Sequence, residues 1–508
     1  MNKSNVDFLD LPNKILLIIL KNLDNIDVLY SLLDVGNQRL HIILQENIFT
    51  NALNSVLTTF TDDISSISDT IVDRFCINIL PRIHHNVKSL ILDSVSMGRI
   101  LLAADYPNLT ELKLFNFNDN IASRYFIDCL NETLKHYTID MYGYILEFFE
   151  NLRHLSIIGS SRCSFGSLIY YNLPSSTFSS STLNKLCIRV INYADCLTVL
   201  DGRFKQLTTL IVDIIDVSHH SSDVYNMDDL PNLKCFSLTT TSTCSVDTYI
   251  KISLLFRRMI NLEQLTLYLT INMETAFIDG THIYNEILVH MPQLHIFNFC
   301  ICTEIDIDRL VDHLSKDDIQ ETFPNTIYQA MDCMIQYNYQ DAICHVFSLP
   351  FMFDYLGCIG NTFPSIIFNH VRRLTVCDEV AFEHEFFNRI AWSFPLLKHL
   401  CVINFNSQSQ ISNKLNSNDN QLNSIVKYSH LIWLRIDSVH IDYVEQFLNE
   451  TKTHLPCLTK LSVYYNHLKI VTKNFTRYIT RRNCIKVNEL DIGKVEHSKD
   501  FNVCFPVL

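Results

Sequence analysis

The chain has 508 residues, of which 48% are hydrophobic and 19% are charged, and its formal net charge at pH 7 is −14. This apolar content predicts a folded protein, and the length exceeds what a single hydrophobic core usually serves. The acidic excess argues against broad contact with nucleic-acid phosphates or with an anionic membrane surface.

The first residues and the cysteines indicate a reduced, intracellular environment. The opening segment MNKSNVDFLDLPNK carries acids and a proline where a signal peptide needs a basic flank and an apolar core. The longest apolar run nearby, Ile15 to Leu20, is too short to span a bilayer. We therefore expect a cytoplasmic or nuclear protein whose 17 cysteines are reduced and mostly buried.

Residues 8–40 predict short helices. Pro12 suits the first turn of a helix, where its missing N–H is not needed. Asp24-Asn25 ends this helix and caps a second one, and a third begins near Asn37. The apolar residues of the first helix recur at three- and four-residue spacing, as amphipathic helices require: Ile15, Leu16, Ile19, Leu20 and Leu23.

Three short helices in about fifty residues cannot bury all of their apolar side chains among themselves. An exposed apolar patch of this kind usually marks an interface with another protein. The other interpretation is an ordinary N-terminal helical cap that packs on the region following it.

One phrase, apolar-x-x-apolar-x-apolar and often opened by Pro-x-Leu, recurs along the rest of the chain. Pro107–Leu114 and Pro231–Leu238 are clear copies. The final alternation of the phrase predicts a strand with one buried face, preceded by a turn. The middle apolar position of successive copies falls at Leu90, Leu112, Tyr137, Leu155, Leu186, Leu210, Phe236, Leu265, Phe297, Leu374, Leu400, Leu434, Leu461 and Leu490.

The spacing of the copies predicts a repeat architecture. Most successive copies are 18–34 residues apart, which leaves room for a helix that returns the chain to a parallel neighbour. The step from Phe297 to Leu374 is longer, and we expect degenerate copies, a loop or an insertion around residues 303–370. A polar segment of low complexity predicts a loop over residues 404–421.

No residue cluster predicts a metal site, a cofactor site or catalysis. No C-x-x-C occurs, and Cys300 and Cys302 near His290 and His295 fit two buried core cysteines better than zinc ligands. Glycines are too few for a phosphate-binding loop. Because nothing selects a nucleophile together with its base, we expect no enzymatic activity, no metal and no cofactor.

A basic ridge is the charged feature that stands out near the C-terminus. Lys469, Lys473, Arg477 and Arg481 recur every four residues and would share one face of a helix. Such a ridge would suit an acidic or phosphorylated peptide. The other interpretation is the solvated outer face of a terminal helix.

The N-terminal pattern resembles an F-box, the small helical module that docks onto the adaptor subunit of cullin–RING ubiquitin ligases. The resemblance rests on the Leu-Pro pair before the first helix, Leu23-Asp24 after it, and the runs Asp27–Leu29 and Val35–Leu40. It implies that the adaptor-binding residues are Leu11, Pro12, Ile15, Ile19, Leu23 and Leu29. Two positions depart from the family pattern, because Lys14 stands where many members have Glu and Leu40 where many have Trp.

The repeated phrase resembles a leucine-rich repeat of the irregular kind found behind F-boxes. It implies an α/β fold in which a short all-helical F-box precedes a leucine-rich-repeat-like solenoid, with a curved parallel sheet inside and helices outside. The Asn or Cys that usually follows the strand of such a repeat is found only at Cys302 and Asn466, so we expect the coils to rely on aromatic packing. The resulting domain limits are 1–52 for the F-box-like module, 53–86 for a helical linker and 87–508 for the solenoid.

Together these resemblances imply a non-catalytic substrate-recognition subunit of an SCF-type ubiquitin ligase. The F-box would bind the adaptor and, through it, the cullin scaffold, while the repeats would bind an unknown protein substrate, with no role for nucleic acid or membrane. The alternative is a repeat-based protein-interaction scaffold with a vestigial F-box that is not coupled to ubiquitin transfer. The partner-reading candidates occupy the variable slots of the strands: Thr110, Glu111, Lys113, Arg153, His154, Glu263, Gln264, Lys398, His399 and Arg435.

Overall fold

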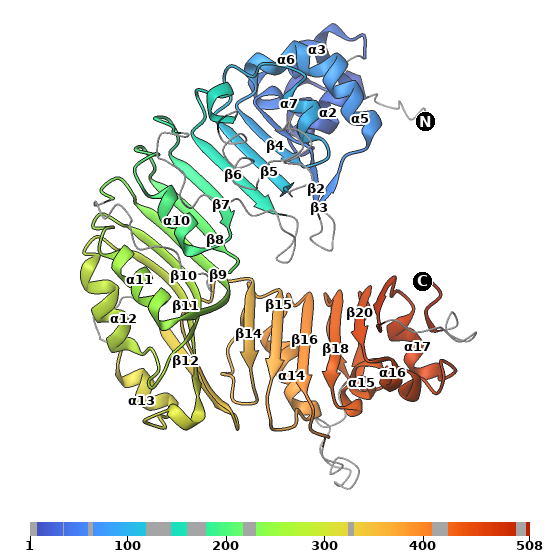
Figure 1. Cartoon of the computed structure of the whole chain (residues 1–508). Coiled ribbons are helices and arrows are strands. Elements are labelled where there is room, and N and C mark those ends of the chain that lie inside the picture. The colour runs from blue at the N-terminus through green and yellow to red at the C-terminus, as the bar shows by residue number, and fades with distance from the viewer. Residues whose placement is uncertain are drawn as a thin grey trace, which may run out of the picture. The chain divides into compact units, whose positions relative to one another are not determined.

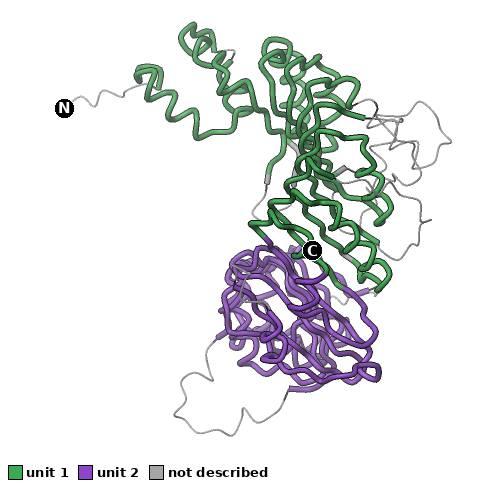
Figure 2. The backbone as a smooth tube through the Cα atoms, turned by 90° about the vertical axis from the view of Figure 1, so that its left-hand side faces the viewer, with its two compact units in different colours: residues 1–270, 286–296 green, residues 271–285, 297–508 purple. Residues whose placement is uncertain are grey.

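The computed structural model shows a mixed α/β fold in which most strands run parallel and helices return the chain between them (Figure 1). The structure describes residues 8–33, 35–58, 64–117, 143, 145–159, 179–216, 230–323, 330–408, 425–493 and 504–507. The chain forms two compact units (Figure 2). Unit 1 consists of residues 1–270 and 286–296, and unit 2 of residues 271–285 and 297–508.

The N-terminal part of unit 1 is helical, as the apolar periodicity predicted. Pro12 is the N-cap of the first α-helix, and the Asn37 side chain caps the third by accepting hydrogen bonds from the backbone N–H groups of Arg39 and Leu40. The elements are η1 (Phe8–Asp10), α1 (Asn13–Leu20), α2 (Asn25–Leu32), α3 (Gln38–Leu44) and α4 (Asn47–Thr50).

Residues 53–86, for which we expected a helical linker, begin instead with strands. Leu53 in β1 pairs with Leu90 of β4, so the parallel sheet starts before the first copy of the repeated phrase. Periodicity did not reveal β1 because three residues are too short to show an alternation. The interval contains β1 (Ala52–Asn54), β2 (Val56–Thr58), β3 (Ile64–Ser66), α5 (Asp69–Arg74), the π-helix η2 (Phe75–Ile79), α6 (Leu80–Ile83) and η3 (His84–Asn86).

The sheet of unit 1 follows the chain order, and each strand from β4 to β9 pairs in parallel with the next. Its strands are β4 (Ser89–Asp93), β5 (Glu111–Phe117), β6 (His154–Gly159), β7 (Lys185–Val190), β8 (Thr209–Ile214), β9 (Cys235–Ser245) and β10 (Gln264–Asn272), whose last residues belong to unit 2. Helical segments on the return paths are α7 (Met97–Leu101), α10 (Tyr193–Val199), α11 (Val246–Phe256) and η4 (Leu288–His290).

The middle apolar position of the phrase sets the register of this sheet. Leu90 pairs with Leu112, Leu112 with Leu155, and so on through Leu186 and Leu210 to Phe236. Each of these side chains is 0% exposed. A slip of one residue would move every one of them to the solvent face, so burial of this row fixes how the strands align. The copy at Tyr137 lies outside the described residues.

A ladder of turn side chains joins successive repeats of unit 1. The residue before the first apolar position of the phrase donates a hydrogen bond to a backbone carbonyl of the preceding turn, and these solvent-exposed bonds repeat from one turn to the next. The donor–acceptor pairs are Asn108–His85 (2.7 Å), Asn151–Pro107 (3.1 Å), Thr182–Glu150 (3.1 Å), Asn232–Lys205 (2.9 Å) and Asn261–Pro231 (3.0 Å).

In unit 2, a second sheet repeats the same pattern, with the middle row Leu356, Leu374, Leu400, Leu434, Leu461 and Leu490 in register. Its strands are β14 (Tyr355–Ile359), β15 (Arg373–Cys377), β16 (His399–Asn404), β18 (Trp433–Val439), β20 (Lys460–Val463) and β21 (Glu489–Asp491), and β17 (Val426–Lys427) pairs separately with β19 (Thr453–His454). The helices are α14 (His384–Ser393), α15 (Ile441–Leu448), α16 (Tyr465–Val471) and α17 (Tyr478–Cys484).

Aromatic side chains fill the space between this second sheet and its helices. The rings of Phe368 and Phe394 are stacked with centroids 4.8 Å apart, and Phe387 of α14 meets Phe447 of α15 edge to face at 4.9 Å. Such pairs add to the stabilisation that burial alone provides. The aromatic packing expected for irregular coils is therefore present in unit 2.

The long step between copies contains an ordered antiparallel hairpin. Strands β12 and β13 pair with each other, and β13 pairs antiparallel with β11. After this insertion the second sheet begins with β14, which lies inside the interval 303–370. Its copy of the phrase is short and interrupted by a bulge, so the sequence pattern did not predict this strand. Of the expected polar loop, residues 409–421 lie outside the described residues. The elements are β11 (Ile296–Asp306), η5 (Ile307–Arg309), α13 (Lys316–Glu321), β12 (Met331–Tyr337) and β13 (Asp341–Ser348), preceded by α12 (Gly280–Glu286).

His345 lies on the hairpin, buried with 3% exposure. Its Nε2 lies 3.7 Å from the Cys302 sulfur and 3.3 Å from the Cys358 carbonyl oxygen, and its Nδ1 has no hydrogen-bond partner in the structure. Burial disfavours the imidazolium and lowers the pKa of His345 to about 4. The native protein therefore holds this side chain neutral under ordinary conditions.

The first prediction concerns the turn ladder. Asn261→Ala removes the donor to Pro231 and should lower the free energy of unfolding by about 1 kcal/mol, measured by urea denaturation. Gln293→Ala is the matched control, because Gln293 occupies the same slot of its phrase and is exposed; it should change stability by less than about 0.5 kcal/mol. Equal effects of the two substitutions would contradict a ladder.

The second prediction concerns acid. An unfolded histidine has a pKa near 6.5, whereas the pKa of buried His345 is about 4. Between these pH values the unfolded chain binds a proton at this position and the folded chain does not. The contribution of His345 to the free energy of unfolding is therefore complete above about pH 6.5. It falls by about 3 kcal/mol as the pH drops towards 4. Denaturation of His345→Gln across this range should therefore show a smaller loss of stability than the unaltered chain shows. Identical slopes would mean that His345 is not held neutral.

Candidate docking surface on the N-terminal helices

Helix α1 is apolar on two faces, of which only one is covered. Leu16 and Leu20 are buried in the module, with 0% and 1% exposure. On the opposite side Ile15 (43%), Ile18 (60%) and Ile19 (39%) face solvent at three- and four-residue spacing. Leu23, in the turn that follows, is 53% exposed and extends the row. We call Ile15, Ile18, Ile19 and Leu23 the α1 stripe. An exposed apolar stripe on a helix usually marks a contact surface.

The predicted adaptor-binding residues divide between surface and core. Ile15, Ile19 and Leu23 lie in the α1 stripe, Pro12 is exposed, and Leu11 is partly exposed. Leu29 is 0% exposed in α2 and packs inside the module, so it is not available for docking.

Three positions outside the predicted adaptor-binding set bear on docking. Ile18 was not in the predicted set, although its spacing of three from Ile15 was a sufficient signal. Of the two departures from the family pattern, Lys14 is exposed beside the stripe, whereas Leu40 is buried with 1% exposure. Only Lys14 can therefore touch a partner directly.

Arg39 of α3 holds the segment that leads into α1. Its guanidinium donates to the Leu9 carbonyl oxygen at 2.9 Å and also to the Leu11 carbonyl oxygen and the Asn13 side chain. Arginine is suited to this contact because its donors form a rigid planar fork. One side chain thus fixes the backbone on both sides of Leu11 and sets how the Leu-Pro pair is presented.

Side chains anchor the helical module to the start of the sheet. Asn25 donates to the backbone carbonyls of Ile48 (3.1 Å) and Ala52 (2.8 Å), which joins α2 to β1. The guanidinium carbon of Arg74 lies 4.5 Å from the ring centroid of Tyr30, a cation–π contact between the linker and α2. The module therefore belongs to unit 1 as a packed part.

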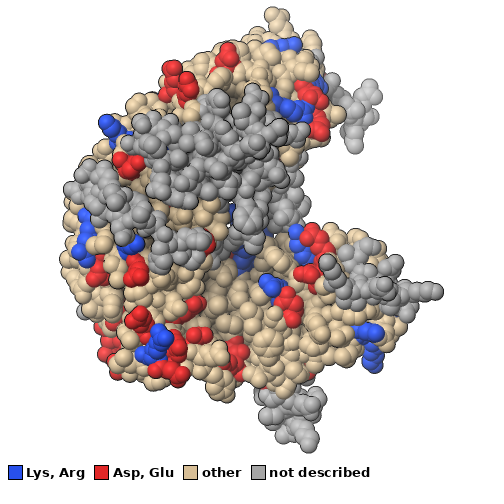
Figure 3. All heavy atoms as spheres, viewed as in Figure 1, with Lys and Arg blue, Asp and Glu red and all other residues tan. Residues whose placement is uncertain are grey.

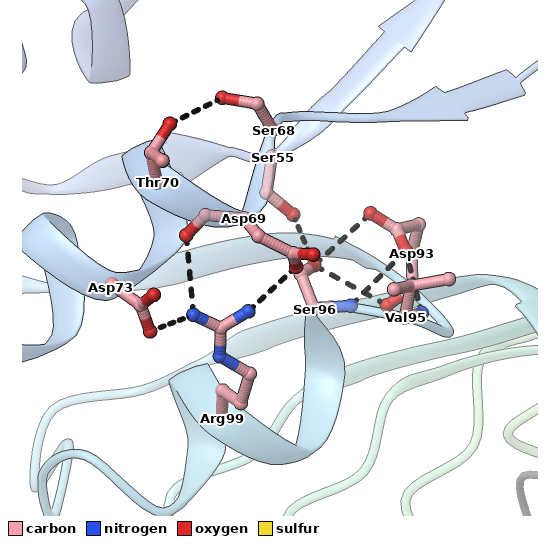
Figure 4. A network of polar contacts seen from close by, with 9 residues as sticks. All are labelled: Ser55, Ser68, Asp69, Thr70, Asp73, Asp93, Val95, Ser96 and Arg99. Carbon is pink, nitrogen blue, oxygen red and sulfur yellow. Dashed lines mark hydrogen bonds and ion pairs between the residues drawn. The ribbon is translucent and has the colours of Figure 1, made fainter.

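A polar network fastens the linker to the first return helix (Figure 4). Arg99 of α7 donates to Asp69 at 2.8 Å and also to Asp73, both on α5. The carboxylates are largely exposed, so each pair contributes modestly on its own.

Beside these ion pairs a buried network continues the contact. Asp93, with 1% exposure, accepts a hydrogen bond from the Ser96 hydroxyl at 3.0 Å, and the hydroxyls of Ser96 and Ser55 lie 3.1 Å apart (Figure 4). A buried carboxylate needs such donors, and here they join β4 to the residue between β1 and β2.

The predicted basic ridge does not form a continuous helical face. Helix α16 ends at Val471, and Lys473, Asn474 and Phe475 all adopt positive φ angles of 50°, 54° and 68° before α17 begins. Arg477 turns inward and donates both guanidinium nitrogens to Glu445 of α15. Four-residue spacing could not reveal this turn, because no glycine or proline marks it.

The two cysteines weighed as zinc ligands are core residues. Cys300 and Cys302 are 1% and 4% exposed on β11, and burial raises the pKa of both thiols. Among the residues that the structure describes, no three His, Cys, Asp or Glu side chains form a group that could hold a metal ion.

A polar cluster lies on the solvent face of the unit 1 sheet. His154 of β6 contacts Glu111 of β5 through Nδ1 (2.8 Å) and the Ser156 hydroxyl through Nε2 (3.0 Å). Burial would raise the pKa of Glu111, but hydrogen bonds from Lys113 (2.8 Å) and Ser89 (2.6 Å) outweigh it and hold the pKa below its usual value.

Positive charges surround the imidazole of this cluster. Burial lowers the pKa of His154, the charge of Glu111 opposes that effect, and the charges of Lys185 and Lys113 add to it. The order Ser156, His154, Glu111 matches a nucleophile with its base and orienting acid. Ser156 is only 3% exposed, so we assign the cluster a structural and charge-presenting role.

Charges elsewhere are mixed. Figure 3 shows Lys and Arg interspersed with Asp and Glu on the face that it draws. Across the described part of the chain, no helix is both long and apolar enough to cross a membrane.

No protein-family model and no curated protein matches the chain. Among solved structures, the chain is similar to the crystal structure of the Rad7 and Elc1 complex in yeast. The two chains are 13% identical, the match covers 89% of this chain and 86% of the other, and the TM-score is 0.28.

The third prediction concerns Arg39. Arg39→Met keeps the apolar stem but removes the donors to Leu9, Leu11 and Asn13. We expect a loss of about 2 kcal/mol in unfolding free energy and faster amide hydrogen exchange over residues 9–20, measured by mass spectrometry. Arg482→Met is the control, because that side chain is 68% exposed and its nearest carboxylate is 3.9 Å away. Unchanged exchange in Arg39→Met would show that the segment holds itself in place.

Proposed function

We propose that this chain is a non-catalytic substrate-recognition subunit of an SCF-type ubiquitin ligase. In this proposal the N-terminal helices are an F-box that binds the adaptor, the repeats are leucine-rich-repeat-like, and their surface recruits a protein for ubiquitin transfer. Recruitment acts by raising the local concentration of substrate lysines near the conjugating enzyme. No residue of the chain needs to act as acid, base or nucleophile.

The observation that carries the proposal is the α1 stripe. The module has enough apolar residues to form its own core, with Leu16, Leu20 and Leu29 inside, and yet leaves a second apolar row in solvent. An amphipathic helix that merely capped the repeats would turn its apolar side inward and leave a polar side outside. The stripe contains three of the six residues that the F-box resemblance assigns to the adaptor, namely Ile15, Ile19 and Leu23.

Arg39 supports the proposal in a second way. Docking surfaces bind more tightly when they are already ordered, because less conformational entropy is lost on association. The Leu-Pro pair beside the stripe is held by hydrogen bonds from Arg39 before any partner arrives. The exposed Lys14 is the feature that favours the alternative, a scaffold whose F-box no longer engages the adaptor.

The fourth prediction is a capture experiment. The full-length chain, co-expressed with the adaptor of a cullin–RING ligase, should co-purify with it. Pro12→Glu combined with Ile19→Asp should weaken capture at least about tenfold, because a charge would enter an apolar contact. Ile470→Asp is the matched control: Ile470 is 63% exposed on α16, far from α1 in the sequence, and the substitution should leave capture unchanged.

Two outcomes would overturn the proposal. Failure of the unaltered, folded chain to capture the adaptor would leave the scaffold interpretation. Undiminished capture by the Pro12→Glu, Ile19→Asp variant would show that the adaptor binds elsewhere.

A further inference from the structure

The solvent face of β4 to β7 in unit 1 collects positive charge within an acidic protein. Ser89, Glu111, His154 and Lys185 form one cross-strand row, each paired in register with the next. These residues are all partly exposed, whereas the leucines that alternate with them are fully buried. The row therefore lines the open face of the sheet.

Lys113 and Lys185 lie on this face, and two further cations stand at the edge of the sheet beside it. Lys113 is held by Glu111 at 2.8 Å. Within the part of the chain that the structure describes, no ion pair is formed by the other three, Lys88, Arg153 and Lys185. Lys88 and Arg153 are exposed at the residues directly before β4 and β6. We call Lys88, Lys113, Arg153 and Lys185 the cationic array.

Little negative charge opposes the array. The four strands contain two acidic residues, Glu111 and Asp93, and Asp93 is buried in the network with Ser96. The contrast is with the residues directly before β9 and β10, where Lys234 is neutralised by Glu263 at 2.6 Å. In a chain with a net charge of −14, a local excess of cations is a feature that an anionic partner would recognise.

The spread of the array favours several separate anions over one. Neighbouring strands lie about 4.8 Å apart, so Lys88 before β4 and Lys185 on β7 are separated by roughly 14 Å. A single phosphate can contact only the cations next to it. An extended peptide places side chains on one face every 6–7 Å or so, and a run of carboxylates could reach several members of the array together.

We propose that the cationic array binds an extended Asp- and Glu-rich segment of a protein partner. The proposal rests on the proposed function in one respect, because it names the class of partner that the repeats would recruit. Glu111 would limit the affinity, since its carboxylate lies on the same face as Lys113 and Lys185 and neutralises Lys113.

The fifth prediction is tested by fluorescence anisotropy of the full-length chain with a labelled peptide in which Glu alternates with Ser. We expect binding that weakens with added salt. Arg153→Glu combined with Lys185→Glu should weaken it about tenfold or more. Glu111→Gln should strengthen it about threefold, since one repulsive charge is removed. Circular dichroism confirms that each variant is folded.

The control removes the same charges elsewhere. Lys469→Glu combined with Lys473→Glu alters two exposed lysines of unit 2 and should change affinity less than about twofold. Equal weakening by the control pair would show that only net charge matters and would overturn the proposal. No binding by the unaltered chain would do the same.

Competing probes separate other anions from the acidic peptide. A peptide with Gln in place of Glu and a single phosphoserine should bind weakly; tighter binding than the acidic peptide would assign the array to a phosphate instead. Single-stranded RNA that competes as well as the acidic peptide would show an unspecific polyanion surface and would also overturn the proposal.

Measuring adaptor capture and peptide binding on the same variants separates the test of the cationic array from the test of the proposed function. The Arg153→Glu, Lys185→Glu variant should still co-purify with the adaptor, and the Pro12→Glu, Ile19→Asp variant should still bind the acidic peptide. Peptide binding without adaptor capture would leave the array proposal standing and remove only the ligase assignment.

Discussion

Burial of one apolar side chain per repeat is the constraint on which the rest of the structure depends. In unit 1 these side chains run in register from Leu53 to Phe236, and in unit 2 from Leu356 to Leu461. Because adjacent strands must align this row, the residues on either side of it are also brought into rows. The Glu111–His154 contact and the cationic array are consequences of that alignment, since their members lie far apart in the sequence.

Much of the repeat architecture could be predicted from the sequence, because the phrase combines two independent signals. The alternation identifies a strand, and the middle apolar residue identifies its register. The strands that escaped prediction lack one of these signals: β1 has three residues, and β14 is interrupted by a bulge between Leu356 and Ile359. The hairpin of β12 and β13 follows a different rule, since antiparallel strands need only a short turn and no return helix.

The candidate docking surface was less predictable, for a physical reason. Periodicity shows that residues share a helix face, but it does not tell which of two apolar faces will be covered. Ile15 and Ile19 proved to be outside, whereas Leu29, equally apolar, lies in the core. The prediction of a continuous basic ridge was wrong for a similar reason. The residues with positive φ after α16 include Lys473 and Phe475, and residues of these types rarely adopt that conformation, so the sequence gives no signal of the turn. Hydrogen bonds such as those of Arg39 depend on tertiary position and leave no periodic signal.

The apolar row also bears on how such a chain can change over evolutionary time. Each repeat contacts mainly its neighbours. To join the apolar row, a repeat needs only one buried apolar side chain and a compatible turn. Duplication or loss of a single phrase would therefore lengthen or shorten the sheet by one strand without changing the other strands. The N-terminal helices are attached to the first strand of the sheet through Asn25 of α2 and Ala52 of β1, so a change in the number of later repeats would leave their exposed stripe as it is.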